Sequence, residues 1–100
     1  MNKAVKTIIH GHVQGVCYRH WAVQNATQLN LDGWVRNRAD GTVEAIFVGK
    51  IEDVDEMINR AQHGPSGAKV DKIDVKEALG IVATGFTQKP TVDINQRRGH

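Results

Sequence analysis

The sequence predicts an α+β domain in which two helices cover one face of an antiparallel sheet. Three observations predict this class. The chain has 100 residues, of which 40% are hydrophobic, and this is the ordinary size of one domain with one core. Two segments show helical periodicity, and each lies between segments rich in β-branched residues. An Asp40-Gly41 pair between two apolar runs is a strong hairpin signal.

The first third of the chain predicts a strand followed by a helix. Residues 3–13 are rich in Val, Ile and Thr and indicate the strand. Residues 19–30 contain neither Gly nor Pro, and three of them recur on one helical face: Ala22, Ala26 and Leu29. We expect Asp32-Gly33 to break this helix.

The middle of the chain predicts a hairpin and a second helix. Residues 34–38 and 42–48 flank Asp40-Gly41 and form two antiparallel strands. Residues 51–62 place four apolar side chains on one stripe, with acidic residues opposite: Val54, Met57, Ile58 and Ala61. The sequence His63-Gly64-Pro65 ends this helix.

The last elements are strands. Residues 70–75 indicate one, and the irregular spacing of their apolar side chains predicts a β-bulge. Residues 80–87 predict a final short strand, which Pro90 confines to a sheet edge because proline cannot donate to a ladder. The resulting order, strand, helix, strand, strand, helix, strand, is the ferredoxin-like split βαβ plan, which hosts many unrelated functions. We assign residues 1–90 to the domain and 91–100 to a polar C-terminal tail.

Composition and charge exclude several classes of partner. A net charge of +2 falls short of the clustered cations that nucleic-acid binding requires. Residues 42–48 also lack the aromatic pattern with which RNA-binding domains of this plan stack bases. No apolar run approaches the roughly 20 residues that span a bilayer, and no export signal precedes the first strand. Because Cys17 is the only cysteine, no intrachain disulfide or thiolate zinc cage can form. We therefore expect a soluble, cytoplasmic monomer.

The segment between the first strand and the first helix predicts an anion site. It consists of Gln14, Gly15, Val16, Cys17, Tyr18 and Arg19. A tight loop that opens a helix directs backbone N–H groups at one point and adds the positive end of the helix dipole. The guanidinium of Arg19 can add a planar fork of donors to phosphate oxygens. The alternative is that Gly11 and Gly15 only shape a turn and that Arg19 is a solvated surface residue.

Two motifs together resemble those of the acylphosphatase family. The first is Gly-x-Val-Gln-Gly-Val-x-x-Arg at residues 11–19, and the second is Gly-Trp-Val-Arg-Asn-x-x-Asp-Gly-x-Val-Glu at residues 33–44. Both occur in the family's order and spacing, and the resemblance extends over residues 3–86. Residues 85–90 depart from the compact closing strand of that family. We expect the polar tail, residues 91–100, not to bear on the assignment of the site.

The resemblance implies an activity and a role for particular residues. It implies hydrolysis of the carboxyl-phosphate bond of an acyl phosphate by direct in-line attack of water, without metal or cofactor. Arg19 would bind the phosphate, Asn37 would orient the water, and the backbone N–H groups of residues 14–19 would cradle the phosphoryl group. The chemistry is consistent, because an acyl phosphate carries a good leaving group and needs mainly positioning and charge neutralisation. Without the resemblance, Asn37 is a turn-flanking residue bonded to its own backbone.

Three other interpretations of these residues stay open. A non-catalytic small-anion-binding or regulatory module would need the loop and Arg19 but not Asn37. Cys17 could act as a nucleophile in an anion-binding loop, although only Tyr18 separates it from Arg19 and so short a loop cannot wrap a phosphate. The simpler interpretation of Cys17 is a small semi-buried side chain. The third interpretation is a metal site formed by His10, His12 and His20. We interpret these instead as satisfied or solvated histidines, because a fourth donor is lacking.

Overall fold

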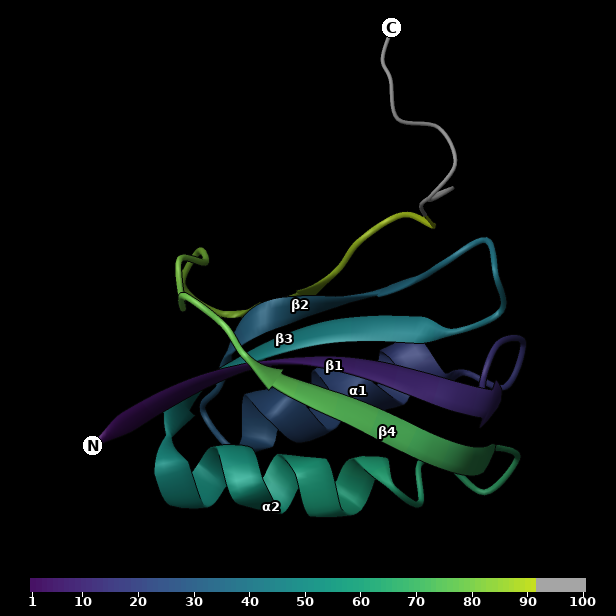
Figure 1. The fold of residues 1–100 in the computed structure, drawn as a ribbon, viewed down its shortest axis with the longest axis horizontal. Coiled ribbons are helices and arrows are strands. Elements are labelled where there is room, and N and C mark those ends of the chain that lie inside the picture. Colours follow the sequence, from purple (N-terminus) through teal and green to yellow (C-terminus); the bar gives the residue numbers. More distant parts are fainter. Residues whose placement is uncertain (92–100) are drawn as a thin grey trace, which may run out of the picture.

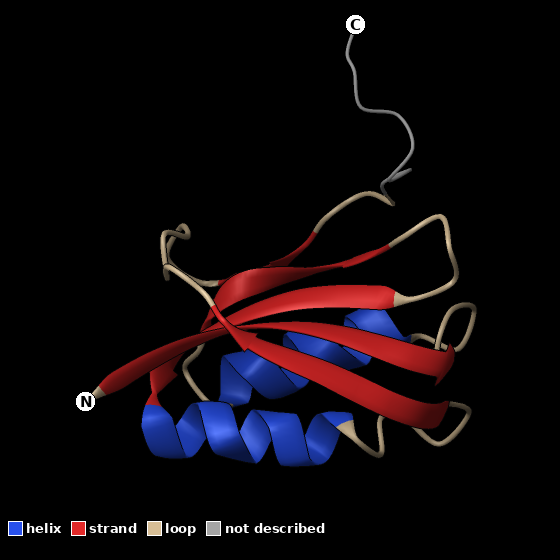
Figure 2. Cartoon of the chain, in the orientation of Figure 1, coloured by secondary structure: helices blue, strands red, loops and turns tan. Residues whose placement is uncertain are grey.

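The computed structural model describes residues 1–91, and its elements follow the predicted order (Figure 1). They are β1 (Asn2–His12), α1 (Tyr18–Gln28), β2 (Asp32–Asn37), β3 (Val43–Lys50), α2 (Ile51–Ala61), β4 (Lys69–Glu77) and β5 (Phe86–Gln88). The strands form one sheet in the order β4-β1-β3-β2-β5. Both helices cover the same face of this sheet (Figure 2). The α+β, ferredoxin-like prediction is confirmed, whereas the predicted tail lies, except for Thr91, outside the described residues.

The sheet is antiparallel from β4 to β2 and gains a parallel edge at β5. β1 pairs antiparallel with β3 and β4, and β3 pairs antiparallel with β2. β5 pairs in parallel with β2, with Gln88 opposite Val35. The sequence did not indicate this parallel pairing, because residues 78–85 carry the chain from one edge of the sheet to the other before β5 begins. Its edge position agrees with the expectation from Pro90.

Two local features test the sequence patterns. His10 and Gly11 of β1 pair with Lys72 and Val70 of β4, so Asp71 is an extra residue and the predicted bulge is confirmed. Asp32-Gly33 does not break the first helix but begins β2. The helix ends at Gln28 because Asn30 adopts a left-handed φ of 57° and the Leu31 N–H donates to the Ala26 carbonyl at 2.9 Å.

Gly33 owes its place in β2 to a close backbone approach. Its φ is 132°, and a Cβ at this position would collide with the carbonyl oxygen of Ile46 on β3. Glycine is the residue that tolerates both conditions. The Gly-Trp pair of the second motif therefore reflects strand packing rather than a turn.

The core lies between the sheet and the two helices. The strands contribute Val5, Ile9, Val35, Val43, Ala45 and Phe47, and the helices contribute Ala22, Ala26, Val54 and Met57. The rings of Phe47 and Phe86 stack with centroids 5.4 Å apart, and this contact fixes β5 to the sheet. The β4–β5 connection leaves two apolar side chains outside the core, Leu79 and Ile81, which are 90% and 86% exposed. No helix in the described part of the chain is both long and apolar enough to cross a membrane.

Candidate active site

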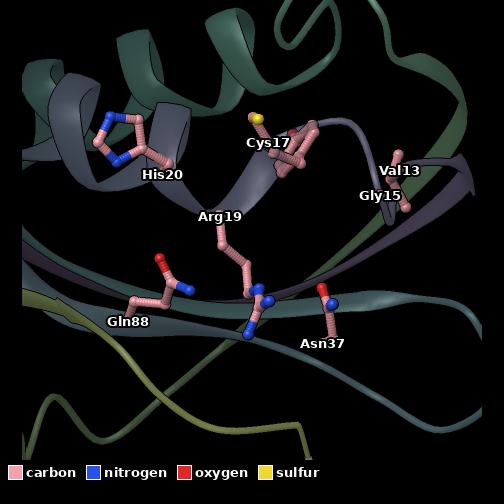
Figure 3. Close-up of a pocket in the computed structure, with 8 residues that line it drawn as sticks. Val13, Gly15, Cys17, Arg19, His20, Asn37 and Gln88 are labelled. Carbon is pink, nitrogen blue, oxygen red and sulfur yellow. The ribbon is translucent and has the colours of Figure 1, made fainter.

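A pocket of about 380 Å³ opens at the start of α1 (Figure 3). Eight residues line it: Val13, Gly15, Cys17, Tyr18, Arg19, His20, Asn37 and Gln88. They come from the β1–α1 loop, the first turn of α1, the end of β2 and the end of β5. The fold thus brings Arg19 of the first motif and Asn37 of the second to one cavity.

The backbone of the β1–α1 loop contains two left-handed residues, a feature of loops that bind anions. Gly15 and Cys17 both have left-handed φ values, 75° and 63°, with Val16 between them. Alternating left- and right-handed residues direct successive N–H groups toward one point. A left-handed non-glycine residue costs of order 1 kcal/mol, so the fold holds Cys17 in a conformation that the residue itself disfavours.

The N-terminus of α1 carries no side-chain substitute for an anion. Cys17 occupies the N-cap position without forming a side-chain capping bond, and the first turn contains no acidic residue. The first N–H groups of a helix have no partner within the helix, and together they carry a partial positive charge. This charge is therefore left for a bound anion.

Arg19 reaches into the pocket from the first turn of α1. Its Nη1 donates to the Lys89 carbonyl at a distance of 3.5 Å. Within residues 1–91, no carboxylate lies at ion-pair distance from its guanidinium. A cation that has only a weak, long hydrogen bond remains available to an anionic ligand.

Asn37 is the last residue of β2 and lies on the helix-facing side of the sheet. It follows the buried Val35 by one full strand repeat, so its side chain projects toward α1. The side-chain hydrogen bonds at the turn of the hairpin are made instead by Gln14, Asp40 and Thr42. In the described residues the Asn37 amide makes no bond to its own backbone, so the turn-residue alternative lacks support.

Of the six predicted loop residues, Gln14 and Val16 do not line the pocket. The Gln14 Nε2 donates to two hairpin carbonyls, Arg38 O at 2.8 Å and Thr42 O at 2.9 Å. It therefore ties the loop to the hairpin that carries Asn37. Val16 is partly buried against the core. The sequence could not indicate this role for Gln14, because a loop amide can bond in any direction.

Tyr18 anchors the loop to the second helix. It is buried, and its hydroxyl donates to the Ala61 carbonyl at the end of α2, 2.7 Å away. Burial raises the pKa of Tyr18, so the phenol stays protonated and keeps donating at neutral pH. The ring of Tyr18 therefore holds the first turn of α1 in place beside the pocket.

The pocket also contains two residues that the motifs did not indicate, His20 and Gln88. Gln88 belongs to β5, so the strand that closes the sheet also reaches the pocket. The Lys89 N–H donates to the Val35 carbonyl at 2.8 Å and fixes the end of β5 beside β2. A parallel edge strand that pairs across so long a connection leaves no local signal in the sequence.

Cys17 and the histidines take positions that differ from the simplest expectations. Cys17 is exposed rather than semi-buried. His10 lies beside a carboxylate: its Nε2 is 2.9 Å from Asp74 Oδ2. This bond lowers the pKa of Asp74. Among His10, His12 and His20, only the last lines the pocket. Residues 1–91 contain no group of three or more His, Cys, Asp or Glu that could hold a metal ion.

The fold and its pocket define a small α+β domain with a pocket at a helix N-terminus. A comparison with protein families supplies the more particular assignment. The family model for acylphosphatase matches residues 5–87, and the chain belongs to the acylphosphatase family.

Individual relatives agree with this membership. The acylphosphatase of Rhizorhabdus wittichii is 56% identical over 84 residues, which are 84% of this chain and 85% of the relative. The acylphosphatase of Rhodospirillum rubrum is 47% identical over 90 residues, which are 90% of this chain and 99% of the relative. Among solved structures, the acylphosphatase from Bacillus subtilis superposes with a TM-score of 0.82 at 30% identity, covering 89% of this chain and 99% of that one.

Proposed function

We propose that this protein hydrolyses acyl phosphates to a carboxylate and inorganic phosphate, with Arg19 and Asn37 as its catalytic residues. Family membership supports the reaction. The observation that supports the assignment of residues is the pocket, which is lined by Arg19, Asn37 and three further loop residues, Gly15, Cys17 and Tyr18. The physiological acyl group is not part of the proposal, since these groups address only the phosphoryl end.

The loop and Arg19 bind the phosphoryl group. Backbone N–H groups of the cradle donate to its oxygens, and the positive end of the α1 dipole favours its charge. The Arg19 guanidinium donates two further bonds in a planar fork. Because these donors are held in place before the substrate arrives, they stabilise the charge that spreads over the phosphoryl oxygens in the transition state.

Asn37 positions the water. Its side-chain carbonyl oxygen accepts a hydrogen bond from a water that attacks phosphorus in line with the leaving oxygen. A bond forms between the water oxygen and phosphorus, the bond from phosphorus to the acyl oxygen breaks, and the electron pair leaves with the carboxylate. The attacking water's proton ends on the phosphate or in solvent. No phosphoenzyme forms, and Cys17 contributes its N–H rather than its thiol.

We also propose that the reaction requires no metal or cofactor and that the protein is a cytoplasmic monomer. A carboxylate of low pKa leaves without Lewis-acid assistance, and the cradle already neutralises charge. The single exposed thiol of Cys17 suits a reducing compartment. In the described residues, five large hydrophobic residues are exposed, Met1, Ile51, Val75, Leu79 and Ile81, and they belong to four different segments of the chain rather than to one long apolar segment.

The test is phosphate release from benzoyl phosphate in the presence of a chelator. We expect wild-type turnover to survive chelation, and Arg19→Ala and Asn37→Ala each to lower kcat by about 100-fold or more. Asn59→Ala, an exposed asparagine on α2, is the matched control and should leave kcat unchanged.

The outcomes separate the parts of the proposal. A wild type that binds phosphate but releases none from any acyl phosphate would favour the non-catalytic anion-binding module. Full activity in Asn37→Ala would refute the water-positioning role alone. Activity that is lost on chelation and restored by a divalent metal would refute metal independence.

A further inference from the structure

We infer that Gln88 forms the acyl-group side of the pocket and donates a hydrogen bond to the departing carboxylate. This inference rests on the proposed function and adds to it a contact that lies outside both motifs. It concerns the part of the substrate that the loop, Arg19 and Asn37 do not address. Gln88 would therefore affect how the enzyme responds to different acyl groups.

The register of the sheet places Gln88 on the same face as Asn37. Gln88 lies directly opposite Val35, whose side chain is buried beneath the helices. Residues paired across two strands project to the same face, and Asn37 follows Val35 by one strand repeat. Gln88 and Asn37 therefore both project toward the start of α1, from neighbouring strands.

The Arg19 side chain separates these two amides. Figure 3 shows the guanidinium descending from α1, with Asn37 on the side of the loop and Gln88 on the other side. His20 lies on the same side as Gln88. The pocket thus has a flank next to the loop with Asn37 and an opposite flank with Gln88 and His20.

In an in-line transfer the leaving group lies on the flank opposite the attacking water. The attacking and leaving oxygens lie roughly in line through phosphorus. If Asn37 holds the water on one flank of the bound phosphoryl group, the acyl oxygen departs toward the other flank. The residues that it meets there are Gln88 and His20.

The chemistry of the glutamine amide suits this position. Its two N–H groups can donate to the acyl carbonyl oxygen and to the leaving oxygen, which gains negative charge as the bond breaks. A bond that strengthens as charge develops lowers the barrier rather than only improving binding. An amide also adds no charge that would compete with the phosphate for Arg19.

β5 is held firmly enough to position this amide. The Gly85 N–H donates to Asp32 Oδ1 at 2.7 Å, and the Lys89 N–H donates to the Val35 carbonyl at 2.8 Å. Between these two bonds Phe86 stacks on Phe47. Gln88 itself is exposed at the pocket mouth, so its side chain can be replaced without opening a cavity in the core.

The test is a series of benzoyl phosphates whose ring substituents vary the pKa of the benzoic acid that leaves. We expect Gln88→Leu to lower kcat/KM by about tenfold for the least acidic leaving groups and by less for the most acidic. The leaving oxygen of a less acidic benzoic acid is more basic, so the hydrogen bond that the variant loses is stronger there. The plot of log kcat/KM against leaving-group pKa should therefore become steeper. The inhibition constant of inorganic phosphate, which has no acyl group, should stay within about twofold.

Two control variants test whether a disturbed β5, or the loss of any exposed glutamine, would change the slope in the same way. Thr87→Val changes the neighbouring β5 residue, whose side chain projects to the other sheet face, and Gln24→Leu changes an exposed glutamine on α1. Both should keep the wild-type slope. An unchanged slope in Gln88→Leu, or an equal loss of phosphate affinity, would overturn the inference while leaving the proposed function intact. Absence of wild-type turnover across the whole series would instead refute the proposed function.

Discussion

The two helices begin in opposite ways. α2 starts directly after β3 from an extended Lys50 and carries Glu52 and Asp53 in its first turn. α1 starts from a left-handed Cys17 and has no acid in its first turn. Arg19 and His20 stand where α2 has its two carboxylates.

This difference separates a helix that serves the fold from one that serves the site. Carboxylates at a helix N-terminus stabilise it by about 0.3–1 kcal/mol each, and α2 has this stabilisation. α1 lacks it, so its N–H groups remain free for the oxygens of a phosphoryl group. The sequence of α1 thus gives up local stability at the point where we propose that the protein binds its ligand.

Among changes that test this comparison of the two helices, the largest expected effect comes from giving α1 an acid in its first turn. His20→Asp places a carboxylate at the position that Asp53 holds in α2. We expect kcat/KM to fall by about tenfold or more, because the new charge repels the phosphoryl group. The free energy of unfolding should rise by about 0.3–1 kcal/mol, because the same charge favours the helix dipole.

Steady-state kinetics and denaturant unfolding check both parts of this prediction. His20→Asn, which has the same shape without the charge, is the matched control for the kinetics. Equal phosphate affinity in His20→Asp and His20→Asn would contradict the account of α1. The reverse change in the other helix, Asp53→Asn, should lower stability slightly and leave kcat/KM unchanged.

The next effect concerns the tie between the loop before α1 and the hairpin. Gln14→Leu removes the two hydrogen bonds from Nε2 to Arg38 O and Thr42 O. Each carbonyl keeps a backbone donor, Gly41 N–H and Arg38 N–H respectively, so the loss should be only about 1–2 kcal/mol of stability. We expect kcat to fall about tenfold as well, since the cradle is no longer fixed relative to Asn37. If stability falls but kcat is unchanged, Gln14 contributes to the fold and not to the positions of the site residues.

A smaller effect tests the strained start of α1. Cys17→Gly removes a side chain from a left-handed position, which should raise the free energy of unfolding by up to about 1 kcal/mol. The N–H group is retained, so activity should stay within about threefold, whereas a thiol nucleophile would make this variant inactive. Thermal unfolding and phosphate release measure the two quantities. A less stable variant would contradict the assignment of strain.

The smallest effect concerns Asp40, a carboxylate in the hairpin turn that accepts a hydrogen bond from a nearby backbone N–H. The first turn of α1 has no acidic residue that could do the same. Asp40 accepts from the Thr42 hydroxyl at 2.6 Å and from the Thr42 N–H at 3.0 Å, and these bonds lower the pKa of Asp40. A depressed pKa means that the stabilisation is present above the unfolded-state value near 3.9 and is lost as pH falls through the folded-state value.

Asp40→Ala should therefore destabilise the protein at pH 7 by only about 0.5 kcal/mol, because the carboxylate is exposed and screened. The difference from wild type should shrink as the pH falls below the unfolded-state pKa and disappear once Asp40 is protonated in the folded protein as well. Urea unfolding at a series of pH values measures it. A difference that persists unchanged at acidic pH would show that the aspartate acts through its shape rather than its charge.

The sequence predicted the elements of the fold because each one has local causes. The stripe Val54, Met57 and Ala61 is buried as its spacing indicated, and the bulge at Asp71 follows from irregular apolar spacing. The pairing of β5 with β2 could not be predicted. It depends on a stack of Phe86 on Phe47 and on bonds from Gly85 and Lys89 that link distant parts of the chain.

The candidate site shows the same division. Arg19 and Asn37 could be singled out because each belongs to a motif, and they do line one pocket. Gln14 and Gln88 could not be assigned to their positions, since nothing in the sequence around a glutamine says where its amide points. The start of the first helix was misplaced by one residue because a left-handed Cys17 is not a usual cap.

The most direct test of the central claim is a titration of the wild-type protein with inorganic phosphate, followed through backbone amide chemical shifts. The account predicts that the largest shifts fall on residues 15–19, at the start of α1, and that the N–H groups of residues 51–53, at the start of α2, do not respond. Shifts of equal size at both helices, or a response centred away from the β1–α1 loop, would contradict it.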